Sequence, residues 1–199
     1  MNKKKDNSSL IKSLTNSTQG YLDVFPKRDL WRQISKEFNG EFKVSHNSGN
    51  EIEILRLNIP YKNHEIVMTE SDTRPLRFEI EFNNKVDYKL TVGWEDSIEK
   101  LLKKIGKREI EIGNKEFDNH YLIRSQDKDK TTKLFSQEIV DYLLKYNVYS
   151  IIYSTNSRKG ISKFSSTISR TIDKKSAYQD LVNMHFRLID KFIEINVIE

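Results

Sequence analysis

Histidines are the side chains best suited to metal binding or proton transfer near neutral pH, and this chain has four. They are His46, His64, His120 and His185. No two have the spacing that places two ligands on one helix face, and the chain has no cysteine. The sequence therefore predicts no metal site and excludes thiolate chemistry and disulfides.

Asp118 and His120 lie two residues apart and could form an acid–base pair. The same spacing often occurs by chance at a loop edge, so a structural role is favoured. His185 falls on the apolar stripe of a predicted final helix, where a hydrogen-bonded core histidine is more common than a ligand or a base. An enzyme with a site near His120 and Asp118 is consequently the least favoured of three hypotheses.

The glycines and serines give no support to nucleotide or serine-hydrolase chemistry. The sequence has no G-x-x-x-x-G-K-[ST] loop, no G-x-G-x-x-G turn and no G-x-S-x-G elbow. We therefore expect no cofactor and no catalytic residue.

A basic segment rich in Ser and Thr covers residues 155–175, with six basic side chains against one acidic, a net charge of +5. Lysine and arginine beside hydroxyls can hold phosphates of nucleic acids or lipid headgroups, and Phe164 could stack on a base. The candidate anion-binding residues are Arg158, Lys159, Lys163 and Arg170. A solvated surface loop is the plainer explanation of the same composition.

These residues must be positioned by a mixture of helices and strands. Apolar spacing predicts helices near residues 27–38, 96–105, 136–145 and 174–195. Strict alternation at 76–82 and 86–92, joined by 83–85, predicts an antiparallel hairpin. Further strands are expected at 41–45, 52–59, 64–68 and 148–153. The fold class is α+β, an antiparallel sheet of about five to seven strands covered by about four helices. Residues 1–20 are expected to form a mobile polar tail, and residues 21–199 a single domain.

A compact motif follows the predicted second helix. Gly113 and Asn114 tolerate the positive φ of a turn, Phe117 should be buried, and Asp118 should accept hydrogen bonds from turn amides. Asp127 should cap the next helix. The pattern G-N-x-E-F-D-x-x-[FY] resembles a family of uncharacterised bacterial domains of unknown function. The likeness covers about residues 98–145 and implies a fold module without an activity.

Location and partners are inferred from what the 199 residues contain and lack. No apolar run follows the basic start Lys3–Lys5, and no stretch approaches the roughly 18 apolar residues of a membrane span, so a cytoplasmic protein is expected. The favoured function is a non-catalytic interaction or accessory protein whose partner is another protein. The alternative is a binder of nucleic acid or acidic membrane through residues 155–175. The oligomeric state stays open.

Overall fold

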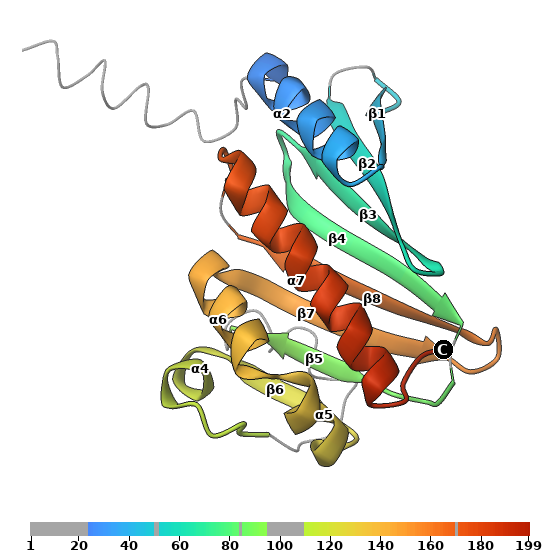
Figure 1. Ribbon diagram of the computed structural model, residues 1–199, viewed down its shortest axis with the longest axis vertical. Coiled ribbons are helices and arrows are strands. Elements are labelled where there is room, and N and C mark those ends of the chain that lie inside the picture. The colour runs from blue at the N-terminus through green and yellow to red at the C-terminus, as the bar shows by residue number, and fades with distance from the viewer. Residues whose placement is uncertain (1–23, 50–51, 84, 95–109, 170) are drawn as a thin grey trace, which may run out of the picture.

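The computed structural model describes residues 24–49, 52–83, 85–94, 110–169 and 171–199 (Figure 1). It contains an antiparallel eight-stranded sheet in the order β1-β2-β3-β4-β8-β7-β5-β6. The strands are β1 (Glu41–His46), β2 (Glu53–Tyr61), β3 (His64–Ser71), β4 (Arg74–Asn83), β5 (Leu90–Gly93), β6 (Leu122–Ser125), β7 (Val148–Asn156) and β8 (Ile161–Ile168). The described helices are α2 (Val24–Glu37), α4 (Lys115–His120), α5 (Lys128–Leu134), α6 (Gln137–Tyr146) and α7 (Lys175–Glu194).

The predicted α+β class is confirmed, but the sheet has eight strands, more than the five to seven expected. Helices α2, α6 and α7 coincide closely with three predicted helices. The fourth predicted helix, 96–105, and the predicted tail, 1–20, lie outside the described residues. None of the helices that the structure describes is long and apolar enough to cross a membrane.

The predicted hairpin between residues 76–82 and 86–92 is wrong. Strand β4 pairs with β3 and β8, whereas β5 pairs with β6 and β7. The β7–β8 hairpin therefore lies between the two segments. Alternation identifies a strand and its buried face, but it does not identify the neighbouring strand.

Helices cover one face of this sheet. One register row crosses seven strands through Leu57, Met68, Phe78, Ser166, Ile151, Val92 and Ile123, and every one of these residues is buried. Helix α7 runs diagonally over this face, with α2 and α6 beside it (Figure 1). Its buried stripe includes Leu181, Leu188 and Phe192, each of which contributes about 1.5–3 kcal/mol by leaving water. The core lies between the helices and this helix-covered face.

The opposite face carries the intervening residues of the same strands. The next row runs through Asn58, Val67, Glu79, Ser165 and Ile152, and none of these side chains is fully buried. We call this the open face across β2, β3, β4, β8 and β7; the next residue in the row, Thr91 of β5, is buried. Most residues of the open face are polar or charged, since side chains that remain in contact with water lose nothing by being charged, although Val67 and Ile152 are apolar.

Candidate functional site

The short helix α4 contains the residues of the predicted structural motif. Phe117 is fully buried, and the Asn114 side chain caps the helix by accepting a hydrogen bond from the Phe117 amide at 3.1 Å. The carboxylate of Asp118 accepts hydrogen bonds from the amides of Ile112 and Gly113 at 3.0 and 2.9 Å. Gly113 has φ +87°, a conformation that suits glycine. Phe117 is therefore buried and Asp118 bonds turn amides, as predicted, whereas Asn114, expected to take a positive φ, has φ −99° and is the N-cap.

Asp118 and His120 make contacts with different groups. Asp118 is occupied by backbone amides, whereas the His120 ring lies edge-on to Trp94 and Tyr121, with centroid distances of 5.4 and 5.0 Å. This geometry gives no support to acid–base chemistry between them.

His185 is fully buried, as predicted, and forms two hydrogen bonds. Its Nδ1 lies 2.6 Å from the carbonyl oxygen of Leu181, which can only accept, so Nδ1 carries the proton. Its Nε2 therefore accepts from the hydroxyl of Ser166, also at 2.6 Å. Burial lowers the pKa of His185 to about 4, and the ring stacks on Phe78 at 3.9 Å. Since Ser166 and His185 are both 0% exposed, no substrate can reach this pair, and its role is in the core.

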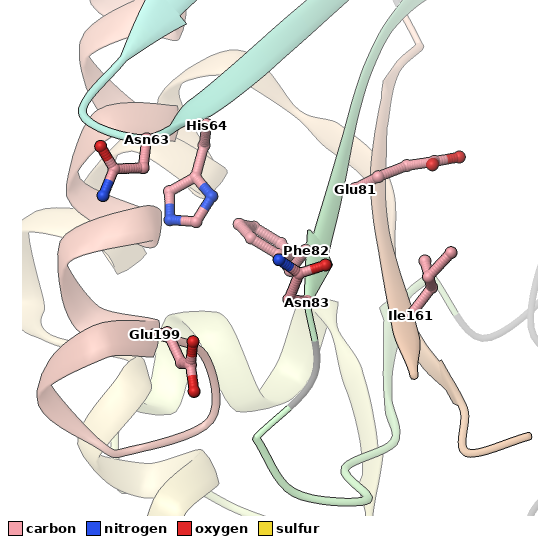
Figure 2. Close-up of a pocket in the computed structure, with 7 residues that line it drawn as sticks. All are labelled: Asn63, His64, Glu81, Phe82, Asn83, Ile161 and Glu199. Carbon is pink, nitrogen blue, oxygen red and sulfur yellow. The ribbon is translucent and has the colours of Figure 1, made fainter. Parts of the chain in front are cut away.

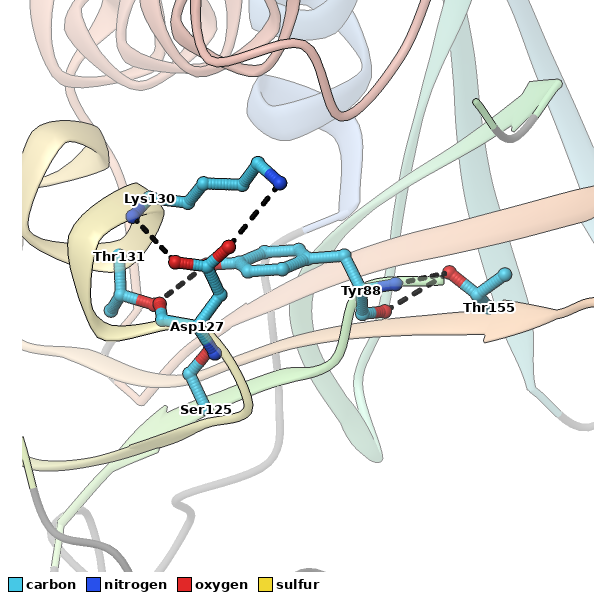
Figure 3. A network of polar contacts seen from close by, with 6 residues as sticks. All are labelled: Tyr88, Ser125, Asp127, Lys130, Thr131 and Thr155. Carbon is cyan, nitrogen blue, oxygen red and sulfur yellow. Dashed lines mark hydrogen bonds and ion pairs between the residues drawn. The ribbon is translucent and has the colours of Figure 1, made fainter. Parts of the chain in front are cut away.

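A second polar cluster joins the segment before β5 to α5 and β7 (Figure 3). The backbone of Tyr88 bonds the Thr155 hydroxyl through both its N–H and its C=O, at 3.2 and 3.0 Å. The phenol of Tyr88 bonds Thr131 at 2.9 Å. Asp127 caps α5 by accepting from the Lys130 amide at 3.0 Å, as predicted. These groups satisfy one another, which is typical of a structural network.

The predicted anion-binding residues that the structure describes lie at different places on the β7–β8 hairpin. Arg158 and Lys159 are exposed in the turn between these strands. Lys163 lies on the open face in an ion pair with Glu81, and the hydrogen bond that it donates to that carboxylate raises the Lys163 pKa. Arg170 lies outside the described residues. Phe164, considered a stacking residue, is 1% exposed in the core, so that hypothesis is wrong.

A small pocket opens at the end of the sheet near His64, with a volume of about 270 Å³ (Figure 2). Burial lowers the pKa of His64, whose ring lies edge-on to Phe82 at 5.0 Å. In Figure 2 the Glu81 side chain extends away from His64, and its carboxylate is paired with Lys163. Within the described part of the chain, no group of three or more His, Cys, Asp or Glu residues could hold a metal ion.

A second concavity is a groove of about 610 Å³ on the open face. It crosses five adjacent strands, β2, β3, β4, β8 and β7. Its lining residues are Arg56, Glu65, Val67, Arg77, Glu79, Ile80, Glu81, Ile152, Ser154, Lys163, Phe164 and Ser165. The groove is large enough for a small molecule or for several residues of a polypeptide.

The shape of this groove follows from the sizes of its side chains. Ser165 and Ser154 are short and leave a low floor beside Val67 and Ile152. The long charged side chains of β2, β3 and β4 stand around that floor. Ser165, in the Ser/Thr-rich segment, thus forms part of the groove floor, a position that composition alone did not indicate.

Charges in the groove are held in exposed pairs. Arg77 Nη2 lies 2.9 Å from Glu79 Oε1, and the side chains are 48% and 46% exposed. Arg56 Nε donates to the Asn58 side-chain oxygen at 3.1 Å, and the Asn58 amide donates to Glu65 at 3.0 Å. The polar groups are spread along the strands and do not converge on one point, as catalytic groups must. This arrangement suits recognition of an extended surface.

Comparisons with known proteins inform the fold. No protein-family model matches the chain, and no curated protein sequence matches it. One similar solved structure is the crystal structure of the mycobacterial trehalose monomycolate transport factor A, TtfA, with a TM-score of 0.51. The likeness covers 86% of this chain and 97% of that chain at 6% sequence identity. At this identity the similarity concerns the fold alone, which this chain shares with TtfA.

Proposed function

We propose that this protein is a non-catalytic interaction protein that receives a segment of another protein in the groove of its open face. The observation that carries the proposal is the groove itself, which crosses five strands and combines a low, partly apolar floor with a charged rim. Such a surface offers many separate contacts to a polypeptide. It offers no converging acid, base and nucleophile.

A crosslinking experiment tests this function directly. A photoreactive amino acid replaces Ser165 in the groove, and a matched protein carries it at Asn183, which is exposed on α7. We expect a discrete protein adduct from Ser165 alone. The captured protein, once purified, should bind the wild-type chain saturably.

A groove-filling variant provides the second readout. Ser165→Trp places a large ring over the floor without entering the core, because this side chain lies on the open face. We expect it to abolish binding of the purified partner, whereas Asn183→Trp leaves binding unchanged. Equal binding by both variants would overturn the proposed function.

A second candidate function is binding to nucleic acid or acidic membranes. It is favoured by Arg158 and Lys159, which are exposed at a turn that extends beyond the end of the sheet (Figure 1). Arg158→Ser with Lys159→Ser should then reduce binding to single-stranded DNA or acidic vesicles at low salt. An absence of wild-type binding at about 50 mM salt, where charges are weakly screened, would rule this candidate out.

A further inference from the structure

The charges of the open face are sorted by sign across neighbouring strands. In the sheet register, Lys43 is opposite Arg56, Arg56 is opposite Thr69, and Thr69 is opposite Arg77. Three of these four positions, which lie in one line across β1 to β4, are therefore basic. We call Lys43, Arg56 and Arg77 the basic row.

Acidic side chains occupy the adjacent lines. Glu41 is opposite Asn58, Asn58 is opposite Val67, and Val67 is opposite Glu79. Glu65 and Glu81 lie two residues further along β3 and β4, on the same face. We call Glu41, Glu65, Glu79 and Glu81 the acidic rows. Glu41 and Glu79 lie about 7 Å from the basic row, the distance that two residues span along a strand, and Glu65 and Glu81 lie about twice as far.

Two ion pairs join the basic row to the acidic rows, whereas Glu81 pairs with Lys163, which is opposite it on β8. Lys43 pairs with Glu41 at 2.8 Å and Arg77 with Glu79 at 2.9 Å, both pairs on a single strand and both well exposed. Exposed pairs contribute little to folding because water already solvates both charges. A ligand can therefore exchange these partners for its own charges without disturbing the sheet.

We propose that the groove recognises a mixed-charge polypeptide segment that presents an acidic and a basic side chain on the same face, about 7 Å apart. In an extended segment, residues i and i+2 have this spacing. The acidic side chain contacts Arg56 and Arg77, and the basic side chain contacts Glu65 and Glu79. A nucleic acid is disfavoured here, since it would bring phosphates beside the acidic rows. The inference rests on the proposed function and names its partner's chemistry.

Two synthetic peptides of about twelve residues test this pattern. One repeats Glu-Ser-Lys-Ser, so that one face of the extended chain carries both signs of charge. The control repeats Glu-Lys-Ser-Ser, which has the same composition but places one sign on each face. Fluorescence anisotropy with the full chain should show affinity about tenfold higher for the first peptide, a difference of about 1.4 kcal/mol.

A charge-swapped protein provides the matched test. Arg77→Glu with Glu79→Arg keeps the net charge and the in-strand pair but inverts the order of the two rows on β4. The control swap, Asp29→Arg with Arg32→Asp, inverts an exposed pair on α2, away from the groove. We expect the groove swap to lower affinity for the first peptide about tenfold, and the α2 swap to leave it unchanged.

Three results would overturn the inference: equal affinity for the two peptides, tighter binding of single-stranded DNA than of the first peptide, or an unchanged affinity in the groove swap. The two proposals fail separately. If Ser165 crosslinks a partner whose binding is unchanged in the groove swap, the proposed function of the groove is kept and the proposed charge pattern is rejected. If the Ser165→Trp variant keeps full affinity for both the partner and the peptide, both proposals are rejected.

Discussion

The two faces of the sheet are made from the same strands, yet they differ in almost every physical property. In β4, Phe78 stacks on His185 in the core, whereas Glu79, the next residue, points to the open face and is 46% exposed. Successive side chains of a strand point to opposite faces, so one strand can serve stability and recognition independently. The open face is therefore free to carry a charge pattern that the core would not tolerate.

Ion pairs show the same contrast. On the helix-covered side, Lys27 of α2 pairs with Glu70 of β3, and both are nearly inaccessible. Tyr178 also donates to Glu70 at 3.1 Å. Burial raises the pKa of Glu70, although Lys27 acts in the opposite direction. The exposed Arg77–Glu79 pair has no comparable desolvation to overcome, so the two kinds of pair should respond differently to mutation.

The sharpest test compares adjacent residues of β4. Phe78→Ala removes a fully buried ring and should lower the free energy of unfolding by about 4 kcal/mol, since it loses burial and leaves a cavity. Glu79→Ala should change it by less than about 0.5 kcal/mol. Urea denaturation monitored by tryptophan fluorescence measures both. A large loss in Glu79→Ala would mean that the open face supports the fold.

Breaking the buried pair should have the next largest effect. Lys27→Met leaves the Glu70 carboxylate without its cation and should cost about 3 kcal/mol at neutral pH. Lys27→Met combined with Glu70→Gln should recover part of that loss, because no unpaired charge remains. If the free-energy losses of the two single variants added in the double variant, Lys27 and Glu70 would not act as a coupled pair.

The free energy of unfolding should decrease at low pH because of His185. Its pKa is about 4 in the folded chain and about 6.5 when unfolded, so the unfolded state binds the extra proton. The stabilisation is complete above pH 6.5 and is lost as pH falls toward 4. Between pH 7.5 and 5, it should decrease by about 2 kcal/mol. In His185→Gln this component should disappear, and an unchanged pH dependence in that variant would contradict the assignment.

How far the sequence predicts this molecule depends on the range of the interactions involved. Helix α7 and strand β4 were predictable because periodic apolar residues reflect local geometry. The cap residue Asp127 was predictable because it bonds an amide only three residues away. Asn114 was expected in a turn with positive φ but is the N-cap of α4 with φ −99°. The short helix α4 was missed, and of α5 only the cap residue Asp127 was predicted, because both helices contain too few turns for a period to stand out.

The groove was not predictable, because it depends on which strands become neighbours. The sequence indicates that Glu79 and Glu81 face solvent, and they do so. It does not indicate that Ser165 lies opposite Glu79, or that Arg56 and Arg77 share a row with Lys43. The first relation appears only after the β7–β8 hairpin has paired with β4, a contact between segments far apart in sequence. The second depends on the registers of the β1–β2, β2–β3 and β3–β4 pairs.

The smallest predicted effect is also the most direct test of the difference between the faces. Swapping the exposed pair, Arg77→Glu with Glu79→Arg, should change the free energy of unfolding by less than about 0.5 kcal/mol, because water solvates either order of charges. The same operation on the buried pair, Lys27→Glu with Glu70→Lys, should be strongly destabilising. It would direct the Tyr178 hydroxyl, which now donates to Glu70, at an ammonium group that has no acceptor. Urea denaturation of both swaps at neutral pH gives the comparison, and similar costs would show that burial does not separate the two faces.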